Sequence, residues 1–162
     1  MRGYGTYTGE WPVSVNTFYR RHMNIIFDKE SFGITQKSLK ILRDELARRI
    51  DNEIIVYEIP VNDICCGFII IDKTRDEAVW TGDGFRFDRG GEGGAGYKTA
   101  EALFQIYGIQ VYQYTTLNLV LDDLWQDSKN KLMVLTEEIN KGSVMDMRFM
   151  KLSEKKPSYL RG

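Results

Sequence analysis

The chain has 162 residues, of which 43% are hydrophobic and 28% are charged, and its formal net charge is −1. This length fits a single domain that buries its own hydrophobic core. The near-neutral charge gives no overall bias toward nucleic acid or an acidic membrane surface. The apolar runs are far shorter than the roughly 20 residues that span a bilayer, and the first residues lack the apolar segment of a signal peptide. We therefore expect a cytoplasmic protein without a membrane partner, and nucleic acid is not indicated as a ligand.

The two cysteines are neighbours, Cys65 and Cys66, inside the apolar run ICCGFIII. Neighbouring residues of a strand point to opposite faces, so a disulfide between them would be strained. We expect two reduced thiols, which fits a reducing cytoplasm. With a single histidine in the chain, we expect no zinc site.

The chain divides into an arm, a domain and a tail. Residues 1–11 combine glycines with aromatic side chains and are interpreted as a flexible arm that packs on its own chain or docks on a second subunit. Residues 12–152 are interpreted as one mixed α/β domain, and residues 153–162 as a polar tail. Within the domain, residues 13–27 fit either a strand or a short helix, and His22 is expected to be a solvated surface residue.

The first clear element is an amphipathic helix over residues 35–50. Thr35 is its expected N-cap, and Arg48 and Arg49 would complement the dipole of its last turn. Its apolar face, with steps of three and four residues, would consist of Leu39, Leu42, Leu46 and Ile50.

Three strands are predicted after this helix. Residues 53–60 are rich in β-branched and aromatic side chains, and residues 64–72 form the near-continuous apolar run of a central strand. After a turn at 73–76, residues 77–87 return as the second arm of a hairpin and weaken where Gly82 and Gly84 enter. The spacing of the apolar residues therefore changes from helical to strand-like at about residue 53.

The remaining elements are a helix over 97–108, a strand over 109–116, mostly helical residues 117–142 and a strand over 145–152. A strand–helix–strand crossover makes the strands that it joins parallel. The predicted fold is a mixed α/β (α+β) single domain with a mostly antiparallel central sheet of about five to six strands and helices packed on its faces.

The stretch DGFRFDRGGEGGAGYK, residues 83–98, is the leading candidate site. Glycines that run into a helix N-terminus allow close approach of a ligand, and the unpaired N–H groups there attract phosphate or pyrophosphate. The stretch lacks the Gly-Lys-Ser/Thr ending of a Walker loop and the strand context of a dinucleotide fingerprint. The expected ligand-binding residues are Arg86, Arg89, Gly91, Gly93, Gly94, Gly96 and Lys98.

Three carboxylates lie in the same stretch, at Asp83, Asp88 and Glu92. They offset the basic side chains, so the local net charge is about neutral. They are also the candidate oxygen ligands for Mg²⁺ or Ca²⁺, although their spacing matches no known calcium loop and solvated carboxylates are the simpler interpretation.

The order of elements from about residue 35 to residue 152 resembles the acyl-CoA-dependent N-acyltransferase (GNAT) family. In that family three antiparallel strands are followed by a glycine-containing pyrophosphate loop, a helix, a strand, a helix and final strands. The family's loop reads Gln or Arg, two residues, Gly, one residue, then Gly or Ala. Residues 90–95, GGEGGA, keep its last two positions, and Arg89 stands one residue before the position of its leading Gln or Arg.

The resemblance implies acyl-CoA as a cofactor, with the N–H groups of residues 91–96 holding its pyrophosphate. In that hypothesis Tyr112 or Tyr114 acts as a general acid, and Glu58 acts as a base through water.

Two classes of function remain open. The first is a non-enzymatic binding or regulatory module that contacts a protein partner, a second copy of itself or a phosphate-bearing small molecule. The nine tyrosines favour this class, because tyrosine is enriched in interface cores, and the chain has no Ser/His/Asp pattern of known spacing, no HExxH and no CxxC. The alternative is an N-acyltransferase-like enzyme that uses acyl-CoA.

Overall fold

A computed structural model describes residues 23–115, 124, 126–141 and 146–150 of the chain, with the backbone alone at 115 and 146–150. The arm at 1–11, His22, the tail at 153–162 and the first part of the helix expected at 117–142 lie outside these residues. The elements are β1 (Asn24–Ile26), η1 (Lys29–Ser31), α2 (Thr35–Arg48), β2 (Ile54–Pro60), β3 (Cys65–Asp72), β4 (Glu77–Trp80), β5 (Phe85–Arg86), α3 (Gly91–Tyr107), β6 (Val111–Thr115), α4 (Ser128–Lys141) and β7 (Asp146–Met150).

The strands form one mixed sheet in the order β1-β4-β3-β2-β6-β7, with the short β5 paired to β3. The mixed α/β fold class is thus confirmed, but the sheet is mixed rather than mostly antiparallel. The meander β2–β3–β4 and the pair β6–β7 are antiparallel, whereas β1–β4 and β2–β6 are parallel. The physical reason is the crossover through α3, which carries the chain past the meander and returns β6 in the direction of β2.

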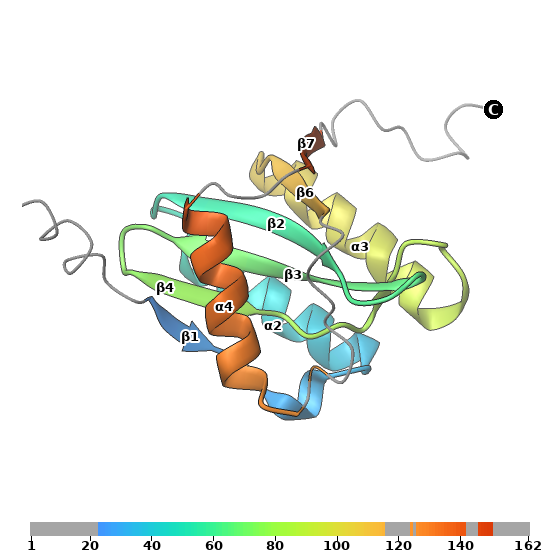
Figure 1. The fold of residues 1–162 in the computed structure, drawn as a ribbon. Coiled ribbons are helices and arrows are strands. Elements are labelled where there is room, and N and C mark those ends of the chain that lie inside the picture. Colours follow the sequence, from blue (N-terminus) through green and yellow to red (C-terminus); the bar gives the residue numbers. More distant parts are fainter. Residues whose placement is uncertain (1–22, 116–123, 125, 142–145, 151–162) are drawn as a thin grey trace, which may run out of the picture.

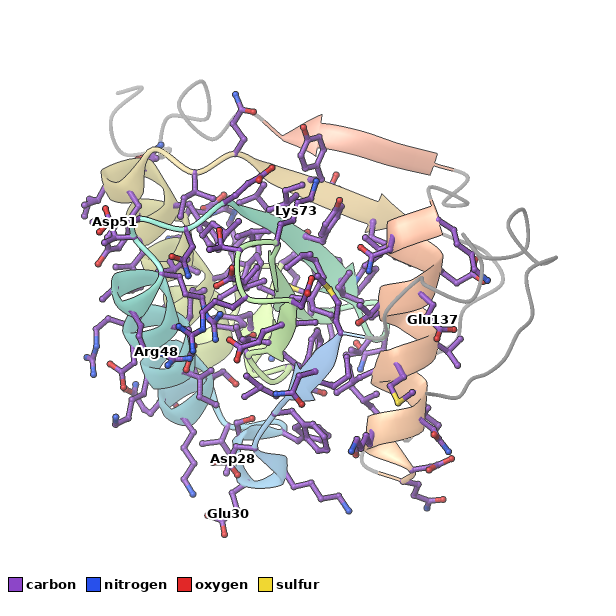
Figure 2. All side chains as sticks on the ribbon, turned by 90° about the vertical axis from the view of Figure 1, so that its left-hand side faces the viewer. Asp28, Glu30, Arg48, Asp51, Lys73 and Glu137 are labelled. Atoms are coloured by element: carbon purple, nitrogen blue, oxygen red, sulfur yellow. The ribbon has the colours of Figure 1, made fainter. Side chains whose placement is uncertain are left out.

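The helices cover both faces of this sheet and make three layers. Helices α2 and α3 lie on one face and α4 lies on the other, as Figures 1 and 2 show from two sides. Because side chains alternate along a strand, Val56 of β2 joins the core under α2 and α3, whereas Tyr57 and Ile59 join the core under α4. In the described part of the chain, no helix is both long and apolar enough to cross a bilayer.

The first helix is shorter than its apolar pattern predicted. It ends at Arg48, so Ile50 lies beyond it and is 65% exposed, while Leu42 and Leu46 are buried as expected. Its N-cap position is Ile34 rather than Thr35. The Thr35 hydroxyl instead donates a hydrogen bond of 2.6 Å to the carbonyl of Gly84, because the following segment folds back over the start of the helix.

The three predicted strands are confirmed, and the hairpin of β3 and β4 has the expected turn between residues 72 and 77. The second arm divides into β4 and β5 at Gly82, whose φ of +101° no extended strand adopts. A Cβ at Gly82 would also lie 2.5 Å from the Ser31 hydroxyl. Glycine therefore turns the chain from β4 toward the start of α2, where it passes over the helix before entering β5.

Candidate functional site

The N-terminal turns of α2 and α3 lie side by side at one end of the molecule. Gln36 of α2 donates a hydrogen bond of 3.0 Å to Glu92 of α3, and neither helix has a side-chain N-cap. The first N–H groups of a helix have no partner within it and carry a partial positive charge. Two such ends therefore meet at the predicted binding stretch. Its residues 83 and 84 contact the start of α2, and its residues 91–98 form the start of α3.

The glycines of this stretch are part of a helix rather than of a loop. Helix α3 begins at Gly91, six residues before the expected start at 97, and Gly90 is its N-cap. A Cβ at Gly94 would overlap the backbone of Arg89, and one at Gly96 would overlap the Thr35 methyl group. Gly93, Gly94 and Gly96 are accordingly buried, so their absence of side chains allows close packing of α3, and only Gly91 of the four expected glycines is exposed.

Arg86 lies across the first turn of α3. Its aliphatic stem covers Gly93, where a Cβ would lie 2.7 Å from Cγ of Arg86, and its guanidinium lies beside Gly90. The guanidinium binds the Asp88 carboxylate through Nε at 3.0 Å and Nη2 at 2.6 Å, and Asp88 also accepts the Gly90 N–H at 3.0 Å. These bonds, with that from Arg86 the strongest, lower the pKa of Asp88. A carboxylate of the chain thus already lies where an anion would bind.

Arg89 is the residue before the N-cap, and its side chain extends along α3 beyond the first turn, toward Tyr97 and Glu101. Its φ of +65° is in the left-handed region, which places the side chain over α3. The guanidinium carbon lies 5.4 Å from the centre of the Tyr97 ring, and the side chain pairs with Glu101 at 3.2 Å. Lys98 is exposed one residue beyond Tyr97.

The three carboxylates of the stretch do not converge. Asp83 accepts the N–H of Gly33 at 2.6 Å, Asp88 binds Arg86, and Glu92 accepts from Gln36. Across residues 23–115 and 126–141, no group of three His, Cys, Asp or Glu side chains is placed to hold a metal ion. Each of the three carboxylates instead accepts hydrogen bonds from a different partner within the chain.

A buried polar cluster lies behind this turn, where the parallel strands β2 and β6 end. Glu58 of β2 is 1% exposed and accepts two hydrogen bonds, from the Tyr97 hydroxyl of α3 at 2.5 Å and from Gln113 of β6 at 3.2 Å. Ligands of open α/β sheets bind outside the carboxyl ends of such strands. Burial, with the adjacent Glu58 carboxylate, raises the pKa of Tyr97, so the phenol remains a neutral donor.

The two tyrosines expected to work with Glu58 lie on the other face of the sheet. Tyr112 packs against Tyr57 with 5.7 Å between ring centres, and both contact the core under α4. Tyr114 is buried in that same core, and burial raises its pKa. The sheet therefore separates both tyrosines from Glu58, and Tyr97, which sequence reasoning missed, is the tyrosine that reaches this carboxylate.

A second buried charge cluster joins the end of α2 to the β3–β4 hairpin. Arg49 is 1% exposed and lies 2.5 Å from Asp72, 2.9 Å from Glu45 and 2.7 Å from Glu77. Arg48, labelled in Figure 2, is the solvent-facing neighbour. Arg49 was expected to lie in the last turn of the helix and complement its dipole. The helix instead ends at Arg48, and the Arg49 side chain is buried.

Sequence reasoning named both Arg86 and Arg89 as ligand-binding residues. The structure places Arg86 across the first turn of α3 and the Arg89 guanidinium farther along the helix, over Tyr97. Sequence reasoning missed Tyr97 and Gln113. A buried glutamate in a predicted strand indicates that hydrogen-bond donors lie near it, but it does not indicate which residues supply them. Comparisons with models of protein families, with curated proteins and with solved structures found no match to this chain.

Proposed function

We propose that this protein is a non-enzymatic binding module whose ligand carries a phosphate or pyrophosphate group. The observation that carries the proposal is the pairing of two uncapped helix N-termini, with Arg86 lying over the first turn of α3. Gly91 and Glu92 of this first turn are exposed, and the first N–H groups of a helix have no partner within it, which favours an anion there. The guanidinium of Arg86 supplies a planar, bidentate partner for phosphate oxygens.

Acyl-CoA belongs to this ligand class, because its pyrophosphate would take the same N–H groups. We propose no acyl transfer, because the sheet lies between Glu58 and the two tyrosines expected to act with it. The two unpaired thiols of Cys65 and Cys66 support a reducing, cytoplasmic setting.

Amide NMR tests the proposal at the residues concerned. Inorganic pyrophosphate, ATP and coenzyme A are titrated into the ¹⁵N-labelled protein while the signals of Gly91, Glu92 and Gly93 are followed. We expect saturable shifts at these amides, and small shifts at the amides of Ser128–Lys141 on the opposite face of the sheet. Shifts that appear equally on both faces, or none at millimolar ligand, would rule the proposal out.

A protein partner is the competing occupant of this surface. If the chain self-associates there, the same three amides shift with protein concentration in the absence of any phosphate. A concentration-dependent shift together with no response to pyrophosphate assigns the surface to assembly instead of ligand binding.

A further inference from the structure

Two glycines at the start of α3 lie under the Arg86 side chain. Gly90 is the N-cap and Gly93 follows three residues later, so both lie on the same side of the helix. A Cβ at Gly93 would lie 2.7 Å from Cγ and 3.0 Å from Cδ of Arg86, and a Cβ at Gly90 would lie 3.2 Å from Nη2. The stem of the arginine therefore lies on Gly93, and its charged end lies beside Gly90.

The space at Gly93 is filled by Arg86. The three atoms nearest to a Cβ at this position are Cγ, Cδ and Cβ of Arg86, the last of them at 3.3 Å. A Cβ at the next residue, Gly94, would instead overlap the backbone of Arg89. Glycine at 94 therefore serves the packing of α3 itself, whereas glycine at 93 makes room for one arginine side chain.

Glycine at 93 has a cost, because glycine stabilises a helix less than alanine does. What it allows is a defined place for the guanidinium of Arg86. Asp88 binds this group through Nε at 3.0 Å and Nη2 at 2.6 Å. Within the described part of the chain Nη1 has no hydrogen-bond partner, and the side chain is 38% exposed. One end of the guanidinium is thus available to a ligand at the first turn of α3.

We propose that Gly93 is a positioning residue, whose missing side chain places the Arg86 guanidinium at the N-terminal end of α3. The inference rests on the proposed function for the ligand, but not for the contact between the two residues. Any side chain at 93 displaces the stem of Arg86, and the guanidinium moves with it. The N–H of residue 93 is the same in glycine and alanine, so Gly93→Ala changes the placement of the arginine and leaves that donor in place.

The first readout needs no ligand. The Nε–H of Arg86 donates to Asp88, and its ¹⁵N NMR signal reports on that bond. We expect this signal to move in Gly93→Ala. The control is Ala102→Ser, which adds one heavy atom on the exposed side of α3 beyond the first turn, and here the signal should stay in place. An Arg86 signal that does not move in Gly93→Ala overturns the inference.

Thermal melts give a second check that also needs no ligand. Alanine favours a helix over glycine, so Gly93→Ala should raise the melting temperature in an Arg86→Ala background, where the stem is absent. The same substitution in the wild type should raise it less or lower it, because the stem is in the way. Equal effects in the two backgrounds overturn the inference, and a Gly93→Ala protein that folds only in the Arg86→Ala background supports it.

Calorimetric titration of inorganic pyrophosphate then connects the contact to binding. We expect about fivefold weaker binding in Gly93→Ala, wild-type affinity in Ala102→Ser, and no added loss when Gly93→Ala is placed in an Arg86→Gln background. Equal affinity in wild type and Gly93→Ala overturns the inference while the proposed function stands. If the wild type binds no pyrophosphate but the Arg86 signal moves in Gly93→Ala, the proposed function fails and the positioning of Arg86 by Gly93 stands.

Discussion

The Arg86 guanidinium and the Asp88 carboxylate form a two-pronged ion pair at the first turn of α3, at 3.0 Å and 2.6 Å. Asp88 also accepts the Gly90 N–H, so it occupies donors that an incoming phosphate would need. Any ligand at this turn must compete with that carboxylate. The competition makes Asp88 the side chain whose removal should improve binding.

Asp88→Asn should therefore strengthen binding of pyrophosphate by about two- to fivefold, since the pair is exposed and such pairs are weak. The amide keeps the size of the side chain and removes its charge. Isothermal titration calorimetry measures the change, with Asp44→Asn on the outer face of α2 as the control. Weaker binding in Asp88→Asn would mean that the carboxylate helps to build the site.

The close packing of α3 depends on glycine at specific positions. A Cβ at Gly94 would overlap the backbone of Arg89, which cannot move aside. A Cβ at Gly90 would meet side-chain atoms instead, Nη2 of Arg86 at 3.2 Å and Oδ1 of Asp88 at 3.5 Å. Gly94→Ala should lower the free energy of unfolding by about 1–3 kcal/mol. Urea denaturation should show a much smaller change for Gly90→Ala, and equal losses in the two variants would contradict this packing.

The buried Arg49 is expected to be the most costly side chain to replace outside the apolar core. Arg49→Met leaves Asp72, which is 0% exposed, without its cation. Removing one partner of a buried pair typically costs about 3–5 kcal/mol of unfolding free energy. The exposed Arg43→Met is the control, expected to change stability by less than about 0.5 kcal/mol.

Stability in acid should depend on Asp72. Burial by itself would raise the pKa of this carboxyl, but hydrogen bonds from Asn52, from Arg49 and from the backbone of Arg75 outweigh burial and lower it. A carboxyl whose pKa is lower in the folded state stabilises the fold above its unfolded pKa, about 4, and loses that contribution as pH falls through the folded value.

The wild type should therefore lose stability below about pH 4 more steeply than Asp72→Asn does. Urea titrations from pH 5 downward measure this slope. Parallel pH profiles for the two proteins would show that folding does not lower the pKa of Asp72.

Glu58→Gln should leave stability unchanged or raise it. Glutamine still accepts the Tyr97 hydroxyl, and the Gln113 amide can turn to accept the new N–H. Glu58→Ala should instead cost about 1–3 kcal/mol, because the buried Tyr97 hydroxyl and the partly buried Gln113 amide both lose their acceptor. Thermal melts of the two variants decide this, and a large loss in Glu58→Gln would indicate that the charge itself holds the fold.

The fold class and most elements could be predicted from the spacing of the apolar residues. Helices and strands bury one face, so their apolar residues recur with the period of the element. The error at the start of α3 arose from glycine, which has low helix propensity and was read as a loop. Here tertiary packing overrides that propensity, since Gly94 and Gly96 are needed where α3 meets Arg89 and Thr35. The intrinsic helix propensity of a residue carries no information about such a contact.

The pairing of strands and the burial of charged side chains could not be predicted either, because both depend on tertiary contacts. Nothing in residues 109–116 specifies that β6 lies beside β2, so the meeting of Glu58 with Gln113 was not predictable. Arg49 fitted the last turn of a longer helix, and its burial depends on the early end of α2, which the sequence did not indicate.

Arg86 and the first turn of α3 are proposed to bind a phosphate-bearing ligand. The decisive experiment is calorimetric titration of inorganic pyrophosphate into wild type, Arg86→Gln and Arg43→Gln. We expect measurable binding to wild type, about tenfold weaker binding to Arg86→Gln from the loss of a charge-assisted contact, and wild-type affinity for Arg43→Gln. Equal affinity in all three proteins, or no heat of binding to wild type, would contradict the claim.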